Sequence, residues 1–125
     1  MYTVSLKKEM IARHFMPQAR DRERSIHSHP YIVELTLEGE TLDDSGYLVD
    51  LDEMDNALTT TVETLRDRVL NDLPAFDHTV PSLENLCRVV FESVVPWLPG
   101  ERLSLARVTI WENPVARASY EKRMH

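Results

Sequence analysis

Residues 29–39, HPYIVELTLEG, hold the clearest secondary-structure signal of the chain. Along this stretch apolar side chains alternate with charged or hydroxyl side chains: Tyr31, Val33, Leu35 and Leu37 alternate with Glu34, Thr36 and Glu38. A period of two is expected of a β-strand that buries one face. The sequence therefore predicts a half-buried strand over 29–39.

Other stretches on both sides of this one also favour extended structure. Residues 2–12 (YTVSLKKEMIA) carry β-branched and aromatic side chains, and residues 103–112 and 115–120 form two strand candidates separated by Asn113-Pro114. Residues 47–49 are expected to form a short extended piece after the turn-forming residues that precede them.

Between residues 50 and 95 the apolar spacing changes to that of helices. One stripe recurs at steps of three and four, which is typical of an amphipathic helix: Leu51, Met54, Leu58, Val62, Leu65 and Val69. Asp50 and Glu53 resemble a capping box at its start. Residues 73–81 contain two prolines and are expected to be a loop, after which Ser82 is a suitable N-cap for a second helix to about Val95.

The predicted order is strand, strand, helix, helix, strand, strand. Such an order favours an α+β domain with an antiparallel sheet and both helices on one face. With 125 residues, the chain has room for a single domain spanning 1–125.

Composition narrows the classes of partner. The formal net charge of -7 argues against binding to nucleic acid, although a local cluster could still hold an anionic small molecule. No stretch is apolar and long enough for a membrane span, and Lys7 and Lys8 interrupt any N-terminal signal sequence. A single cysteine, Cys87, is expected to be a small buried hydrophobe, and the chain is expected to be cytoplasmic.

Three histidines form a candidate metal site. His27 and His29 lie two residues apart at the start of the clearest strand, so their rings project from the same face. His14, at the end of the preceding strand candidate, can supply a third ligand if the two strands pair. Three imidazoles without a thiolate would leave one position of a zinc ion open, as in catalytic zinc sites. The alternative is a pair of exposed histidines that hold no ion.

Several short motifs occur in the order seen in one enzyme family. Between His14 and Tyr120 they are Ala12-Arg13-His14-Phe15, His27-Ser28-His29, Gly46-Tyr47-Leu48-Val49-Asp50, Pro81-Ser82-Leu83-Glu84-Asn85-Leu86 and Val108-Thr109-Ile110-Trp111-Glu112-Asn113-Pro114. Together they resemble the 6-pyruvoyl-tetrahydropterin synthase and 6-carboxytetrahydropterin synthase family. That resemblance implies the tunnelling fold, in which ββααββ subunits join their sheets into a barrel, commonly as trimers paired into hexamers.

The resemblance also implies roles for particular residues. His14, His27 and His29 would hold a zinc ion that polarises the side-chain hydroxyls of dihydroneopterin triphosphate. Glu112 would anchor the pterin ring through two N–H bonds to its carboxylate. Ser82 occupies a position at which the family has a threonine that faces the pterin, which is compatible with a role as N-cap.

Two departures from the family pattern concern proton transfer. Glu23 stands where the family has its usual catalytic cysteine, four residues before the first histidine of the pair. It is either a charge in a polar loop or a carboxylate general base beside the zinc. A branch of the family that carries Glu at this position is associated with release of 6-hydroxymethyl-dihydropterin.

The second departure lies after the first helix. The family's Asp-His pair is replaced by Arg66 and Asp67, within Leu65–Asn71. Another Asp-His pair, Asp77-His78, occurs in the following loop, either by accident or because it reaches the same pocket.

These observations lead to three hypotheses. The first is a zinc-dependent lyase that acts on a pterin triphosphate, with Glu23 as base and Asp67 or His78 assisting. The second is a homologue that keeps the zinc and binds a pterin or purine-like ligand without the usual turnover. The third is a structural subunit whose histidine cluster is empty.

Overall fold

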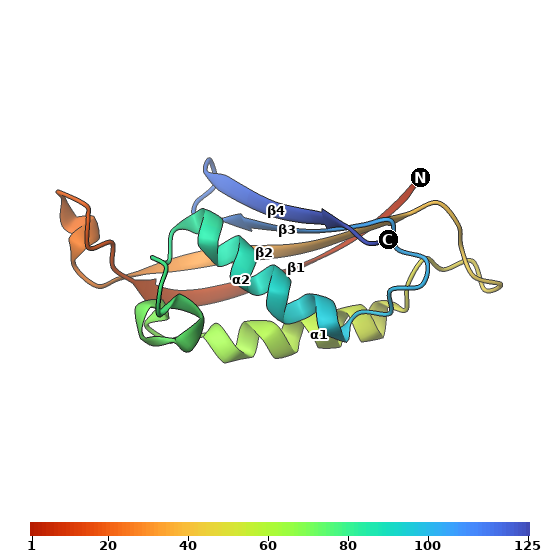
Figure 1. Ribbon diagram of the computed structural model, residues 1–125, viewed down its shortest axis with the longest axis horizontal. Helices are drawn as coiled ribbons and strands as arrows, with labels where there is room; N and C mark the ends of the chain where they lie inside the picture. Colours follow the sequence, from red (N-terminus) through yellow and green to blue (C-terminus); the bar gives the residue numbers. More distant parts are fainter.

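The computed structural model describes residues 1–125, apart from the side chain of Arg22. Its main elements, in chain order, are β1 (Tyr2–His14), β2 (His27–Gly39), α1 (Leu51–Leu65), α2 (Leu83–Val94), β3 (Leu105–Trp111) and β4 (Arg117–Arg123). The strands form one antiparallel sheet in the order β1-β2-β3-β4. Both helices pack on the same face of this sheet (Figure 1), which confirms the predicted α+β arrangement.

The β1–β2 hairpin is the longest pairing in the sheet. It is in register from Tyr2 opposite Gly39 to His14 opposite His27. β2 begins at His27, two residues before the predicted start, because His27 and Ser28 pair with the end of β1 although they add nothing to the apolar alternation. This extension places two histidines opposite each other at the end of the hairpin.

The core lies between the sheet and the two helices. The predicted stripe of α1 buries Met54, Leu58 and Val62, and α2 contributes a second set of buried side chains that includes Leu86 and Val90. Apolar burial of this kind is the main stabilising contribution in a domain of this size. The apolar stripes therefore determine which side of each helix faces the sheet.

Both predicted helix starts are confirmed. The carboxylate of Asp50 accepts hydrogen bonds from the backbone N–H groups of Asp52 (2.8 Å) and Glu53 (3.4 Å). The hydroxyl oxygen of Ser82 accepts one from the N–H of Asn85 at 3.2 Å. These bonds satisfy N–H groups that have no partner inside the helix.

The predicted extension of the first helix to Val69 is wrong. α1 ends at Leu65, and Asp67 adopts a left-handed conformation with φ of 61°. The chain then runs beside β1, where the N–H of Asp67 donates to the carbonyl of Ile11 (2.7 Å) and Val69 bridges Arg13. Val69 keeps the helical spacing in the sequence but belongs to this extended segment.

Other predicted boundaries also shift. Residues 47–49 form bends and no strand, although Leu48 and Val49 are buried. The side chain of Asn113 accepts from the N–H groups of Val115 and Ala116, which keeps both in a turn, so β4 begins at Arg117 and continues to Arg123. β3 begins at Leu105, two residues after the predicted start at 103. The predicted loop at 73–81 contains a 3-10 turn at Pro74–Phe76.

The opposite face of the sheet carries no helix. On this face the ring of Trp111 lies between two cations: the Lys7 ammonium is 4.8 Å from the ring centroid, and the Arg117 guanidinium carbon is 5.7 Å away. Such cation–π contacts hold the indole in place on a surface that water can reach. Across the part of the chain that is described, no helix has the length and apolar character needed to cross a bilayer.

Candidate functional site

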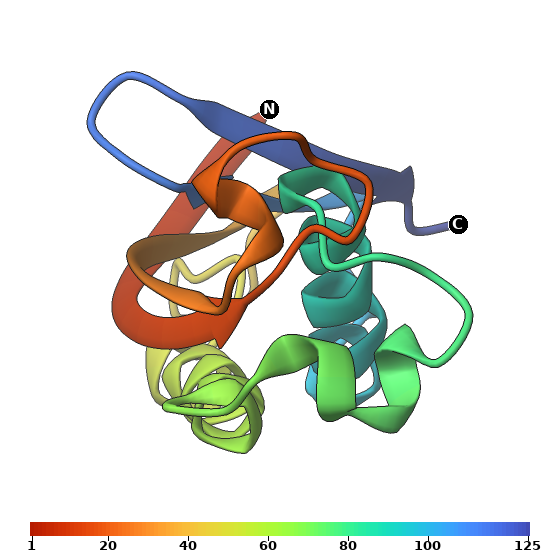
Figure 2. The same cartoon turned by 90° about the vertical axis from the view of Figure 1, so that its left-hand side faces the viewer.

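Two segments that are far apart in the chain meet at one end of the molecule. The β1–β2 loop and the segment between α1 and α2 both face the viewer in Figure 2. Asn71 holds them together, because its side chain accepts from the N–H of Phe15 (3.0 Å) and donates to the carbonyl of Phe15 (2.9 Å). The end of β1, with His14, is thereby fixed against the segment that leads to α2.

His14 and His27 are held in one tautomer by backbone carbonyls. Nδ1–H of His14 donates to the carbonyl of Pro81 at 2.9 Å, and Nδ1–H of His27 donates to that of Ser25 at 2.8 Å. A carbonyl can only accept, so the proton of each neutral ring is on Nδ1 and the lone pair is on Nε2. The two Nε2 atoms lie 2.9 Å apart. Two lone pairs at this distance require a proton or a metal cation between them.

His29 completes the group of three rings. Its ring centroid lies 5.0 Å from that of His14 and 4.8 Å from that of His27. Its Nε2 atom is buried and has no hydrogen-bond partner among the described residues, although the Oε1 atom of Glu112 lies 3.3 Å away. Burial lowers the pKa of His29 and outweighs the opposing effect of Glu112. The ring is therefore neutral and able to bind a metal.

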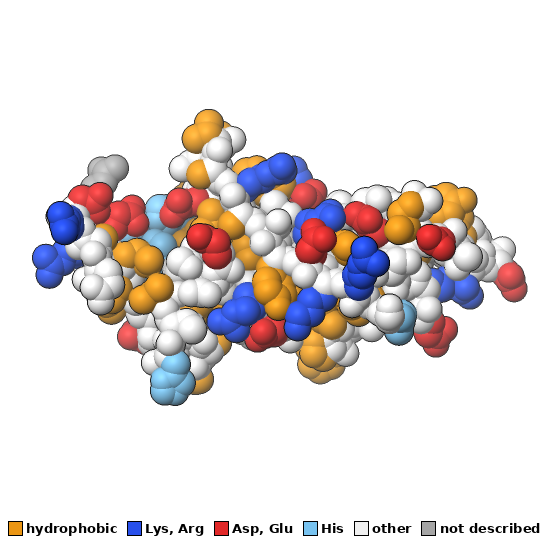
Figure 3. Space-filling model, turned by 45° about the horizontal axis from the view of Figure 1, so that its top comes forward, with side chains coloured by type: hydrophobic (Ala, Val, Ile, Leu, Met, Phe, Trp, Pro, Cys, Tyr) orange, Lys and Arg blue, Asp and Glu red, His pale blue; other side chains and the backbone are white. Residues whose placement is uncertain are grey.

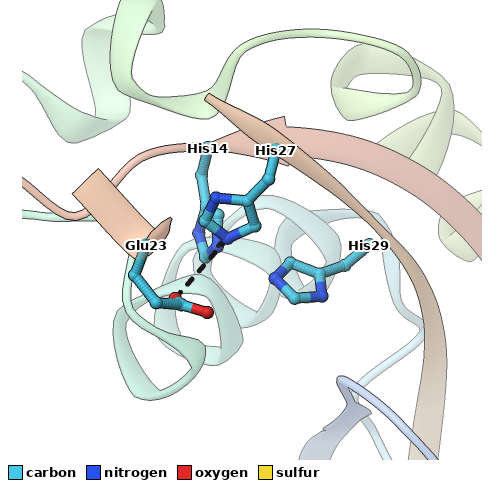
Figure 4. Close-up of side chains that lie close together, drawn as sticks. All are labelled: His14, Glu23, His27 and His29. Carbon is cyan, nitrogen blue, oxygen red and sulfur yellow. Dashed lines mark hydrogen bonds and ion pairs between the residues drawn. The ribbon is translucent and has the colours of Figure 1, made fainter. Parts of the chain in front are cut away.

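Glu23 faces the same point from the β1–β2 loop. Its Oε2 atom is 3.5 Å from Nε2 of His27. One potential ligand atom from each of His14, Glu23, His27 and His29 lies within 4.8 Å of all the others, and Figure 4 shows these side chains pointing toward one another. Figure 3 shows histidine atoms reaching the surface beside acidic side chains near this end. Three imidazole nitrogens and a carboxylate oxygen form a donor set that suits zinc.

The other predicted site residues are not in this group. Among the described residues, the metal-ligating cluster includes neither Asp67, which is exposed at the end of α1, nor His78, which is exposed in the loop after the 3-10 turn at Pro74–Phe76. Ser82 caps α2, and it directly follows Pro81, whose carbonyl holds His14. Glu112 lies next to the cluster through its contact with His29.

Three residues contribute to the site in ways that the sequence patterns do not predict. The carbonyls of Ser25 and Pro81 orient two histidines, and no side-chain motif reveals a role that belongs to the backbone. The alternation in 29–39 predicts only a core role for Tyr31, yet its ring centroid lies 5.3 Å from that of His29. Burial, together with the charges of Glu112 and Glu23, raises the pKa of Tyr31 and keeps its hydroxyl protonated. The spacing of Tyr31, two residues after His29 on one strand face, was the available signal.

Cys87 is confirmed as a buried residue of α2. Its side chain is fully buried, and the thiol donates to the carbonyl of Ala118 at 3.3 Å. Burial raises the pKa of the thiol to about 12. A thiol that stays protonated in this way is a poor base and a poor nucleophile.

Known proteins resemble this chain in sequence. The sequence profile of the 6-pyruvoyl tetrahydropterin synthase family matches residues 3–123. The 6-carboxy-5,6,7,8-tetrahydropterin synthase of Bacillus subtilis (strain 168) is 28% identical over 132 aligned positions, which cover 98% of this chain and 88% of the relative.

Solved structures share the fold. The 6-pyruvoyl tetrahydropterin synthase of Caenorhabditis elegans superimposes with a TM-score of 0.82 and 24% identity, covering 97% of this chain and 95% of the other. A Plasmodium vivax 6-pyruvoyltetrahydropterin synthase gives a TM-score of 0.70 and 17% identity, covering 98% of this chain and 99% of the other. That structure is a mutant in which a glutamate, described as a catalytic residue, is replaced by alanine.

Proposed function

The chain belongs to the 6-pyruvoyl tetrahydropterin synthase family, and from this premise we propose that it is a zinc-dependent lyase acting on dihydroneopterin triphosphate or a related pterin. The observation that carries the proposal is the pair of Nε2 lone pairs 2.9 Å apart on His14 and His27, with the unpartnered Nε2 of His29 beside them. Zinc bound by these three residues would polarise the hydroxyl groups of the substrate side chain.

Glu112 is the proposed anchor of the pterin ring. An ionised carboxylate can accept two N–H bonds from the 2-aminopyrimidine edge, and such charge-assisted pairs fix orientation as well as adding affinity. Its position 3.3 Å from His29 would hold the ring next to the metal ligands. Ser82 follows the carbonyl that orients His14 and is proposed to contact the ligand in addition to capping α2.

Glu23 is the proposed general base. Its carboxylate is part of the cluster, so it would lie beside a substrate hydroxyl held at the metal site and could take the proton of that hydroxyl. The Plasmodium vivax relative, whose fold this chain shares, is described as having a catalytic glutamate. Asp67 and His78 lie outside the cluster of their own subunit. Either residue would assist only at a site that a second copy completes.

Assembly is part of the same proposal. β1 and β4 form the two edges of the sheet, and each leaves backbone groups on one side without a strand partner among the described residues. Exposed edges of this kind favour pairing with another chain. We expect trimers, or trimers paired as hexamers, with the sheets joined edge to edge. Sedimentation equilibrium measures the mass directly, and a monomer at micromolar concentration would contradict this part of the proposal.

The test of the activity is turnover of dihydroneopterin triphosphate by purified, zinc-loaded protein. We expect release of triphosphate or of a small aldehyde, lost on chelation and restored by added zinc. Glu23→Gln should abolish turnover, whereas Glu40→Gln, the same change at an exposed position outside the site, should preserve it. Zinc-loaded protein that releases no fragment would overturn the enzymatic proposal.

A second candidate function is ligand binding without the usual turnover. The observation that favours it is the position of Asp67 and His78 outside the cluster, because the family's proton relay is then incomplete within one subunit. Tight binding of a pterin without turnover, weakened by Glu112→Gln and unaffected by Glu23→Ala, would favour this second function.

A further inference from the structure

The backbone of Glu23 is held firmly in the β1–β2 loop. Glu23 lies in a single 3-10 turn, Arg22–Arg24. Its N–H donates to the carboxylate of Asp21 at 2.9 Å, and its carbonyl accepts from the N–H of Met16 at 2.7 Å. These two hydrogen bonds fix the backbone position from which the Glu23 carboxylate faces the histidines.

Three of the four groups in the cluster face one another as acceptors. Nε2 of His14 and of His27 carry lone pairs, because the Nδ1–H of each ring is donated to a carbonyl. The Glu23 carboxylate lies 3.5 Å from Nε2 of His27. Converging acceptors are stable only around a positive charge. A carboxylate in this position would therefore contact a bound metal cation directly.

From this geometry we propose that Glu23 is the fourth ligand of the zinc in the substrate-free protein. The inference rests on the proposed zinc site, and it concerns the ligand position that three histidines leave open. With Glu23 bound, the resting site is closed to water and small anions. Substrate would then bind by exchange, with one of its hydroxyl oxygens replacing the Glu23 carboxylate oxygen as the fourth ligand.

The exchange also explains how one residue can be both ligand and base. The side chain of Glu23 is 40% exposed, so it can leave the metal without crossing the packed core. Once released, the carboxylate lies beside the hydroxyl that has replaced it, and it can accept the proton of that hydroxyl. Glu23 is therefore proposed to exclude competing ligands first and to act as base only when substrate is bound.

The test is carried out on full-length protein loaded with Co²⁺, whose visible absorption reports the ligands of the metal. If Glu23 closes the site, added azide leaves the wild-type spectrum unchanged, and Glu40→Gln behaves in the same way. In Glu23→Gln, azide should bind and shift the bands. The wild-type titration requires no variant: a spectrum that responds to azide as strongly as that of Glu23→Gln would overturn the inference.

A second measurement uses zinc affinity. Loss of a direct ligand should raise the zinc Kd of Glu23→Gln at least about tenfold, since loss of even an outer-shell partner costs roughly 10–100-fold. Glu23→Gln must keep the circular dichroism spectrum of the wild type. An unchanged zinc Kd in folded Glu23→Gln would also contradict the inference.

Neither measurement uses a pterin, so the two proposals can fail separately. Turnover by a protein whose Co²⁺ site is open to azide would support the proposed function and overturn the fourth ligand. A Co²⁺ site that is closed to azide, in a protein that does not turn over pterins, would support the fourth ligand and overturn the proposed enzymatic function. Wild-type protein that binds no metal would overturn the zinc site on which both proposals depend.

Discussion

At the scale of the single residue, the side chain of His14 links its own strand, β1, to two other segments of the site. One ring nitrogen contacts the carbonyl of Pro81 and the other faces His27, so the ring joins β2 to the start of α2. The sequence indicated His27 and His29 through their spacing on a strand. The inclusion of His14 depended on strand pairing and family resemblance, because a single histidine carries no spacing signal.

Removing one imidazole should abolish stoichiometric zinc. We expect His27→Ala to lose the metal because the remaining rings offer only two nitrogen ligands. His78→Ala is the matched control, since this exposed histidine lies outside the cluster. Elemental analysis of purified protein measures the zinc content of each variant. Retention of zinc by His27→Ala, or its loss from His78→Ala, would argue against the assigned ligands.

Ionisation of Cys87 should lower stability only in alkaline solution. Burial raises the pKa of its thiol to about 12 in the folded chain, whereas an unfolded thiol titrates near pH 8.5 or so. The stabilisation from this group is therefore complete below about pH 8.5 and is lost as pH rises toward the folded pKa. Urea unfolding between pH 7 and 11 should show a steeper alkaline loss in the wild type than in Cys87→Ala. Equal slopes, or rapid labelling of the native thiol at pH 8, would contradict this.

At the scale of the secondary-structure element, the two helix caps have different consequences. Asp50→Ala and Ser82→Ala should each lower the free energy of unfolding of metal-free protein by about 1 kcal/mol. Only Ser82→Ala should also raise the zinc Kd, because it loosens the chain beside Pro81, whose carbonyl orients His14. Chemical denaturation in chelator and zinc titration measure the two effects. A similar rise of the zinc Kd in Asp50→Ala would show that the cap of α2 has no specific effect on the metal site.

The boundaries of elements were less predictable than their types. Local spacing predicted β2 and both helix starts, because alternation and capping depend on neighbouring residues. The apolar spacing stays helical as far as Val69 and so predicts a longer helix, whereas the pairing of Asp67 with Ile11 ends α1 at Leu65. That contact joins residues far apart in the sequence. The same limit applies to the site, where the carbonyls of Ser25 and Pro81 act through tertiary structure.

At the scale of the whole molecule, the proposed zinc site should contribute to stability. It joins β1, β2 and the start of α2, which are separated in the unfolded chain. Binding to the folded state alone stabilises by RT ln(1 + [L]/Kd), about 2.7 kcal/mol at free zinc one hundred times its Kd. We expect chelation to lower the Tm of the wild type.

The matched control for this effect is His27→Ala. Its Tm should not respond to chelator, since it lacks the stoichiometric metal. Differential scanning calorimetry with and without chelator measures both proteins. An unchanged Tm of the wild type after complete removal of zinc would show that the site adds no stability.

The class of the fold was predictable because it depends on the order of elements and on which faces are apolar. The number of copies in the assembly was not predictable. Edge strands such as β1 and β4 favour pairing with another chain but do not determine how many copies associate. The family resemblance supplied the expected trimer or hexamer.

Trp111, whose indole ring lies between two cations, can serve as a spectroscopic reporter. Its ring lies on the sheet face that carries no helix, between Lys7 and Arg117, and it directly precedes Glu112 in the chain. The other tryptophan, Trp97, is 68% exposed and can be changed to phenylalanine with little effect on the core. In Trp97→Phe, the fluorescence of a single indole would follow events one residue away from the proposed pterin anchor. Emission that shifts on adding a pterin would give a direct binding signal that needs no label and no turnover.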